Sequence, residues 1–294
     1  MPHRLAITAV LIACGKSSEP SKMDRERAAA LFTEVVVDTA PGLSGLAVDD
    51  RGRLWTVAER DEKAYRITLD AALAPTLETF DIEGVPEGTD LEGMGWLGNG
   101  KLALGTEGRR NGVATVVLAE ERGTKLVVTS TIQIPDSAVG LHLESNQGAE
   151  GVCGFGDTIV VAIESSATAE GKRWAPIVLI EHGAIVSSHR LWLTTKTGKL
   201  SALDCSMATD GTITAIAIER HFEVTKFLAF SLPAGTADIT PTEALDLGLV
   251  LNSTINLEGI AKLPDGRVVA VIDNQWKGIT GPSELLVFKL GAVK

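Results

Sequence analysis

Five short segments of the chain place an oxygen-bearing side chain at corresponding positions of a repeated motif. These key residues are Ser44, Glu92, Glu150, Asp204 and Glu258. Hydroxyl and carboxylate oxygens without clustered His or Cys are the ligands that Ca²⁺ prefers, whereas Zn²⁺ and copper favour nitrogen and sulfur. If the fold brings the key residues together, their carboxylates repel one another unless a cation offsets the charge. The sequence therefore predicts a Ca²⁺ site; the alternative is that the acids only cap turns or accept backbone hydrogen bonds.

A second acidic residue follows each key residue by 14 or 15 positions, at the end of an apolar segment. These second acids are Glu59, Glu107, Glu164, Glu219 and Asp273. Basic residues stand close behind several of them, namely Arg60, Arg109, Arg110 and Arg220. A metal ion beside arginines suits a phosphorylated or carboxylated small molecule, so we predict that both groups contact substrate. The alternative is that the basic residues only neutralise the acids.

The elements that must position these residues form a repeat. Each unit has about 50 residues and contains the motif, a Gly-containing turn and further apolar strands, which is typical of a β-propeller blade. The last unit lacks its fourth strand, and the segment Phe32–Thr39 can supply it and remove a free edge. The sequence predicts an all-β, five-bladed β-propeller with four-stranded blades, closed by this N-terminal strand. A hairpin joins the first two strands of a blade, so the key residues and the second acids should face one mouth of the channel.

The first residues of the sequence have the pattern of a targeting segment. Leu5–Ala13 is a nine-residue apolar run, too short to span a bilayer and suited to a signal peptide. Cys14 follows it, and the segment resembles a bacterial lipoprotein lipobox, which implies lipidation of Cys14; the alternative is an ordinary secretory signal. Gly15 after the cysteine resembles lipoproteins sent to the outer membrane, facing the periplasm or the surface. We thus expect a signal peptide and lipobox over 1–14, a polar tether over 15–31 and one propeller domain over 32–294.

The amino-acid composition restricts the classes of molecule that we expect the protein to bind. The chain has 27 basic and 38 acidic residues, a formal charge of −11, which argues against nucleic acid as a partner. Hydrophobic residues make up 45% of the chain, enough for a sizeable core. We expect a lipid-anchored monomer that takes a small anionic molecule.

Two further cysteines, Cys153 and Cys205, fall on the inner strands of neighbouring predicted blades. Inner strands of adjacent blades diverge, and Cα atoms more than about 7 Å apart cannot be bridged. We therefore expect two buried free thiols, with a disulfide as the alternative.

The Leu-Glu-Gly or Leu-Ser-Gly start, the Asp-Gly turn and the acid-ending strand resemble secreted bacterial propellers described as "esterase-like activity of phytase". The resemblance covers roughly Phe32 to Lys294. The key residues are also similar to those of calcium-activated nucleotidases (apyrases), five-bladed propellers that hold a central Ca²⁺ with Ser, Glu, Glu, Ser and Glu. The fourth unit departs from that order, with Asp204 in place of Ser and Ser206 nearby. These resemblances imply a Ca²⁺-dependent hydrolase acting on phosphoesters, phytase-like or nucleotidase-like.

Two other functions remain open. A non-catalytic propeller could use the same mouth to bind a ligand or a protein, and would turn over no substrate. A lactonase-type ester hydrolase could also use carboxylates around one ion, and would show an apolar pocket around Trp276 or Trp96. The phosphoester hypothesis instead predicts that the arginines of the mouth matter.

Overall fold

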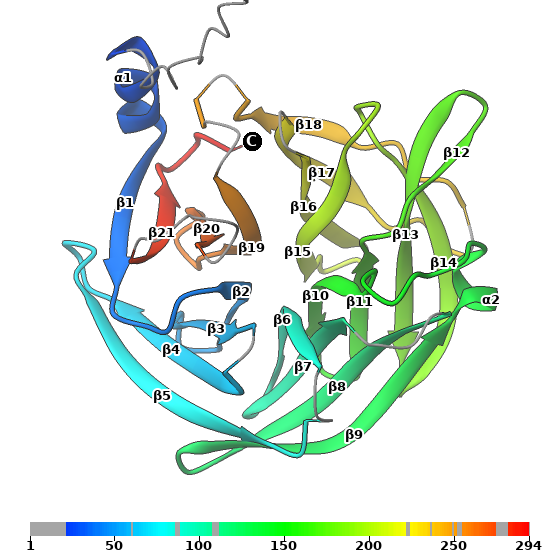
Figure 1. Ribbon diagram of the computed structural model, residues 1–294, viewed down its shortest axis with the longest axis horizontal. Coiled ribbons are helices and arrows are strands. Elements are labelled where there is room, and N and C mark those ends of the chain that lie inside the picture. The colour runs from blue at the N-terminus through cyan, green and yellow to red at the C-terminus, as the bar shows by residue number, and fades with distance from the viewer. Residues whose placement is uncertain are drawn as a thin grey trace, which may run out of the picture.

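Five strands surround the centre of the molecule in the computed structural model, which describes residues 22–59, 61–85, 89–107, 112–221, 224–235, 237–248, 250–251, 255–274 and 282–293. These inner strands are β2 (Leu43–Val48), β6 (Asp90–Gly98), β10 (Ala149–Phe155), β15 (Lys199–Met207) and β19 (Asn256–Lys262). Each contacts the next along the chain, and β19 contacts β2, so they form a closed ring (Figure 1). The fold is therefore all-β and propeller-like.

Antiparallel strands extend outward from each inner strand. The order β2-β3-β4-β5-β9-β8-β7-β6 makes an eight-stranded sheet with β3 (Leu54–Ala58), β4 (Lys63–Leu69), β5 (Pro75–Glu83), β7 (Lys101–Glu107), β8 (Val113–Arg122) and β9 (Lys125–Pro135). In this sheet β5 and β9 pair in parallel through only three residue pairs, from Asp81 with Lys125 to Glu83 with Val127. This seam joins two four-stranded antiparallel halves.

Three further sheets complete the ring. One contains β10, β11 (Thr158–Ile163), β12 (Ala167–Ala169), β13 (Lys172–Glu181) and β14 (Ala184–Trp192). Another has the order β15-β16-β17-β18, with β16 (Ile213–His221), β17 (Val224–Ser231) and β18 (Thr242–Asp246). The last has the order β1-β21-β20-β19, with β1 (Phe32–Val37), β21 (Ser283–Phe288) and β20 (Val268–Asp273).

The N-terminal strand closes the last sheet. β1 pairs antiparallel with β21, from Phe32 opposite Phe288 to Val37 opposite Ser283. The prediction that this segment supplies the missing strand is thus confirmed. Helix α1 (Lys22–Leu31) precedes β1 and occupies part of the predicted tether, and a short helix α2 (Asp136–Val139) follows β9.

Large side chains fill the spaces between neighbouring groups of strands. Trp55 is fully buried and stacks on Trp96, with ring centroids 6.0 Å apart, so this contact joins the two halves of the eight-stranded sheet. Phe227 of β17 packs edge-on against Phe288 of β21 at 5.0 Å and joins two neighbouring sheets.

The inner strands approach one another closely because the motif carries glycine after the key residue. A Cβ atom at Gly93 would lie 2.8 Å from the main-chain oxygen of Glu150, and one at Gly151 would lie 2.6 Å from Leu203 Cβ. The glycines therefore serve strand packing.

The same close approach corrects the prediction of free thiols. Cys153 of β10 and Cys205 of β15 form a disulfide, with Cα atoms 5.7 Å apart. Divergence between blades had suggested a wider separation, but Gly151 lets β15 come close enough for the bridge.

The described helices offer no candidate for a membrane-spanning segment: none is both long and apolar enough.

Candidate metal centre

In four of the five inner strands a β-bulge lies at the key residue or directly after it. The pairing register shifts between Leu91 and Gly93, between Ala149 and Gly151, and between Leu257 and Gly259, so the extra residue is Glu92, Glu150 and Glu258 respectively. In β2 the shift follows Ser44 directly. Bulges re-aim side chains, and here they occur where the side chains face the channel.

In the fourth inner strand the bulge is at Ser201. The register shifts between Leu200 and Ala202, so Ser201 occupies the position that the glutamates hold elsewhere. Its hydroxyl donates to the main-chain oxygen of Leu257 at 2.8 Å. The Ser44 hydroxyl likewise donates to the main-chain oxygen of Glu92, at 2.6 Å, and lies 3.0 Å from Glu92 Oε2. The two serines therefore play matching structural parts.

Asp204 does not join this group, which corrects the sequence assignment. It lies three residues further along β15, where its Oδ2 accepts the main-chain N–H of Lys262 at 2.8 Å. Lys262 is the last residue of β19, whereas Glu258 stands near the start of that strand. Asp204 is thus at the other end of the inner strands from the glutamates.

Glu219 also does not take the position at the mouth that the sequence predicted for a substrate-contacting acid. It is fully buried, and its carboxylate accepts four hydrogen bonds of 2.5–3.0 Å from the main-chain and hydroxyl groups of Thr194 and Thr195. Such a carboxylate stabilises a loop and has no free oxygen for a substrate. Arg220, one residue on, takes the corresponding place at the mouth.

Glu258 carries an unpaired oxygen. Its Oε1 accepts hydrogen bonds from Arg220 Nη2 and, at 2.7 Å, from Asn256 Nδ2. Its Oε2 is buried without a hydrogen-bond partner among the described residues. A buried carboxylate oxygen in that state is costly unless a ligand occupies the site.

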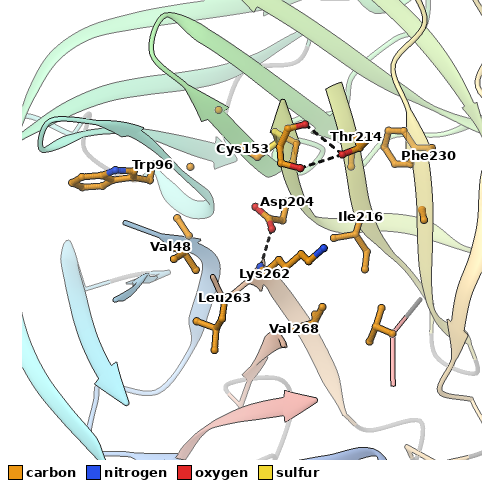
Figure 2. A pocket seen from close by; sticks show the side chains of 18 of the residues that line it. Val48, Trp96, Cys153, Asp204, Thr214, Ile216, Phe230, Lys262, Leu263 and Val268 are labelled. Atoms are coloured by element: carbon orange, nitrogen blue, oxygen red, sulfur yellow. Dashed lines mark hydrogen bonds between the residues drawn. A yellow bond between two sulfur atoms is a disulfide. The ribbon is translucent and has the colours of Figure 1, made fainter. Parts of the chain in front are cut away.

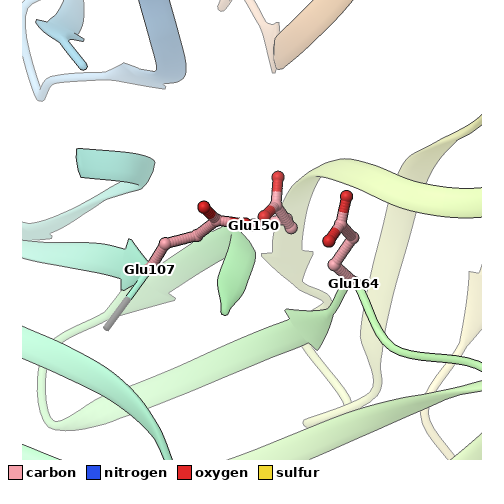
Figure 3. Close-up of side chains that lie close together, drawn as sticks. All are labelled: Glu107, Glu150 and Glu164. Carbon is pink, nitrogen blue, oxygen red and sulfur yellow. The ribbon is translucent and has the colours of Figure 1, made fainter. Parts of the chain in front are cut away.

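The carboxylate of Glu150 lies close to those of two second acids, Glu107 and Glu164 (Figure 3). Carboxylate oxygens of Glu107, Glu150 and Glu164 lie within 4.8 Å of one another. The carboxylates of Glu107 and Glu150 are close enough to share a hydrogen bond when one of them carries a proton. Glu164 is neutralised by an ion pair with Lys199.

The electrostatics of the cluster favour either protons or a cation. Burial raises the pKa of Glu92 and Glu150 well above the ordinary 4.5, and neighbouring carboxylates, Glu258 among them, raise both further. Burial raises the pKa of Glu107 to about 7. Burial also raises the pKa of Glu258, although the Arg220 guanidinium opposes the shift.

The remaining second acids lie close to this cluster. The main-chain N–H of Glu59 donates to Gly42 at 2.9 Å, and the Glu59 carboxylate helps to raise the pKa of Glu92. Asp273 Oδ2 accepts a 2.9 Å hydrogen bond from Asn256, which links it to Glu258. Cys14, Arg60, Arg109 and Arg110, together with Trp276, lie outside the described residues.

A basic sector adjoins the carboxylates, and the sequence pointed to Arg173 and Arg220 in it but not to Lys199. Burial and the positive charges of Lys199, Arg173 and Arg220 lower the pKa of His221. Arg173 hydrogen-bonds Ser166, and the Nε atoms of Arg173 and Arg220 are buried without partners among the described residues. Lys199 does not follow a second acid in the sequence, so the spacing of the repeat could not reveal it.

The closed ring of inner strands and the buried carboxylates at one mouth define a propeller-like protein with a candidate cation site. The chain belongs to the phytase-like family described as "Esterase-like activity of phytase", whose model matches residues 38–275. This confirms the family resemblance inferred from the motifs. No curated protein sequence matches the chain significantly.

Several solved structures align with most of the chain at low identity. PQQ-bound aldose sugar dehydrogenase from Streptomyces coelicolor is 12% identical with a TM-score of 0.44, over 88% of this chain and 98% of that chain. A protein of unknown function from Dyadobacter fermentans is 9% identical with a TM-score of 0.48, over 89% and 83%. Catalytically inactive virginiamycin B lyase from Staphylococcus aureus with quinupristin is 11% identical with a TM-score of 0.45, over 88% and 99%. Likenesses this distant carry no argument about the chemistry of the site.

Proposed function

We propose that the carboxylate mouth holds Ca²⁺ and that the protein is a Ca²⁺-dependent hydrolase of phosphoesters. The observation that carries the proposal is the burial of Glu92, Glu150 and Glu258 so near one another that the Glu258 charge raises the pKa of the other two, while one Glu258 oxygen has no hydrogen-bond partner among the described residues. The proposed ligands are Ser44, Glu92, Glu150, Ser201 and Glu258. An all-oxygen set of this kind fits a hard cation, which takes six to eight oxygens in total when water is included.

We also infer five blades. Each half of the eight-stranded sheet begins at an inner strand and runs outward through four antiparallel strands. Counting β2–β5 and β6–β9 as separate blades gives one blade for each inner strand. Each blade then contributes one residue to the proposed cation site.

The basic sector supports an anionic substrate. Lys199 and Arg220 would attract and orient a phosphate group next to the carboxylates, since guanidinium and ammonium groups bind phosphate strongly. When bound, Ca²⁺ would polarise a phosphoryl oxygen and lower the pKa of a coordinated water. The Glu107 carboxyl, with its pKa of about 7, is suited to exchange a proton at neutral pH.

The test is turnover of a substrate panel by the mature protein, with Ca²⁺ and with EDTA. The panel contains nucleotides, phytate, generic phosphoesters and lactones. We expect Ca²⁺-dependent release of phosphate, and a Glu107→Gln variant should lower kcat by about a hundredfold. Glu181→Gln, an exposed glutamate at the end of β13, is the matched control and should leave kcat unchanged. Binding of Ca²⁺ without turnover of any phosphoester would contradict the hydrolase and favour a binding module; turnover of lactones alone would favour the ester hydrolase.

Placing Ser201 instead of Asp204 among the proposed ligands leads to a further prediction. Ser201→Ala should weaken Ca²⁺ binding severalfold by removing an oxygen ligand, whereas Asp204→Asn should leave the affinity unchanged because Asp204 lies at the other end of β15. Calorimetric titration with Ca²⁺ measures both. Equal losses in the two variants would mean that the bulge at Ser201 does not define the site.

We further propose that the protein is lipid-anchored through Cys14 in the bacterial outer membrane. Cys14→Ser should move the protein from the detergent phase to the aqueous phase in detergent partitioning, or block its maturation, because one acyl-bearing cysteine would be lost. Unchanged partitioning of the variant would refute the anchor.

A further inference from the structure

A cavity of about 840 Å³ lies at the end of the inner strands remote from the glutamates; Figure 2 shows the residues that line it. We call it the distal groove. One wall is the face of the β15–β18 sheet, with Asp204, Ser206, Thr214, Ile216, Ala229, Ser231 and Thr242. The facing wall comes from the end of β19 and from β20, with Lys262, Leu263, Pro264 and Val268.

The sheet wall consists of two rows of side chains. Asp204, Ile216, Ala229 and Thr242 are successive partners across β15, β16, β17 and β18, so their side chains share one face. Ser206, Thr214 and Ser231 form the next row toward the strand ends, and the Ser206 and Thr214 hydroxyls lie 3.1 Å apart. The groove thus has one row whose middle residues, Ile216 and Ala229, are apolar, and beside it a row of hydroxyls.

The groove is open because the side chains of this face become smaller toward the strand ends. One row deeper, Ile218 and Phe227 are fully buried, and Phe227 packs against Phe288 of the adjacent sheet. In the next row the residue that follows Phe227 on this face of β17 is Ala229, whose small side chain leaves a space that no described side chain fills.

The polar groups of the groove differ in whether their hydrogen bonds are already made within the protein. The Asp204 carboxylate already accepts main-chain N–H groups of Lys262 and Cys205. Lys262 pairs with Val268 across β19 and β20, so its side chain extends over the groove, toward Ile216 in Figure 2. Its ammonium group is near enough for its charge to lower the pKa of Asp204, but it makes no hydrogen bond or salt bridge within the described part of the chain. The hydrogen-bond donors still available among the described charged groups of the groove are therefore on Lys262.

We propose that the distal groove binds a small amphipathic monocarboxylate, with the carboxylate on Lys262 and the apolar body over Ile216, Ala229 and Val268. The volume falls within the range of pockets for small molecules, about 300–1,000 Å³. The hydroxyls of Ser206 and Thr214 are additional donors for the same carboxylate. This site is separate from the carboxylate mouth and does not depend on the proposed hydrolase.

The experiment is a calorimetric titration of the full chain with three probes that share an eight-carbon body: octanoate, 1-octanol and octylammonium. Octanoate should bind at least about tenfold more tightly than 1-octanol, because only the carboxylate forms a charge-assisted hydrogen bond with Lys262. Octylammonium binding as tightly as octanoate would overturn the proposal, because the groove would then select for Asp204.

Three variants sharpen the test. Lys262→Met keeps the apolar stem and should reduce octanoate affinity to that of 1-octanol, whereas Lys101→Met, an exposed lysine at the start of β7, should change nothing. Ala229→Phe should abolish binding of all three probes by filling the groove, with the melting temperature confirming that the variant folds. Octanoate affinity that survives either Lys262→Met or Ala229→Phe would overturn the proposal. Glu150→Gln should bind octanoate like the unmodified protein, so failure here is distinguishable from failure of the metal site.

Discussion

Stripped of divalent cations, the protein is expected to lose stability as the pH rises from about 5 to about 8. Burial raises the pKa of Glu92 and Glu150 well above 4.5, and that of Glu107 to about 7. The folded state therefore keeps protons that the unfolded chain releases near pH 4.5, so the free energy of unfolding falls across this interval, by about 1.4 kcal/mol for each unit of pKa shift. Melting temperatures in EDTA from pH 5 to 8 measure the effect.

Calcium should reverse this trend. A ligand that binds only the folded state at a hundredfold excess over Kd adds about 2.7 kcal/mol to the free energy of unfolding. The gain should increase with pH, because Ca²⁺ competes with protons for the carboxylates. A melting temperature that responds to neither Ca²⁺ nor EDTA at any pH would refute the cation site.

Glu150→Gln separates the two contributions. Without metal at pH 8 the variant should be more stable than the unmodified protein, because one buried carboxylate no longer has to ionise beside Glu92 and Glu258. With Ca²⁺ the variant should gain less, because a charged ligand is missing. Glu181→Gln, exposed and remote in sequence from the motif, is the control and should match the unmodified protein in both conditions.

Loss of the Cys153–Cys205 disulfide is expected to lower the free energy of unfolding by about 4 kcal/mol, from the loop-closure entropy of a bridge spanning 52 residues. In a domain of this size the melting temperature should fall by about 10 °C. The double variant Cys153→Ala/Cys205→Ala, compared with the reduced and oxidised unmodified protein, measures it. Dithiothreitol should shift only the unmodified protein. If two free thiols titrate in the unfolded, non-reduced chain, the bridge is absent.

The sequence predicted the inner strands well because the same signal occurs five times. In four units the key residue that the motif identified lies at a β-bulge or directly before one: Glu92, Glu150 and Glu258 are the extra residues, and the register shift of β2 follows Ser44. Closure by β1 was also predictable, because the last unit was visibly one strand short.

The fourth unit was misassigned for a physical reason. Six more residues of β15 follow Ser201 before the turn, whereas only four more residues of β19 follow Glu258, and the turns after both strands have five residues, 208–212 and 263–267. The longer paired strands move Glu219 out of register, so Asp204 and Glu219 kept the usual spacing by coincidence. Leu200-Ser201-Ala202, which resembles Leu43-Ser44-Gly45, was the signal that could have found the position.

Contacts between units were harder to predict than contacts within them. The disulfide depends on how closely β10 and β15 approach, and that depends on Gly151, whose packing role is visible only in three dimensions. Similarly, Arg173 and Arg220 come from different sheets and meet only around His221. Spacing along one chain carries no information on such distances.

The pairing of β1 with β21 has a consequence for how the protein matures. Phe32 finds its partner in Phe288, so the sheet that closes the ring combines segments from opposite ends of the described chain. Contacts between residues so far apart in sequence form late in folding, because closing the long loop between them costs conformational entropy before the contacts add any stability. During synthesis β1 emerges long before β21 exists. A prematurely terminated chain would therefore keep an unpaired strand edge at β1, whereas the finished chain covers that edge with β21.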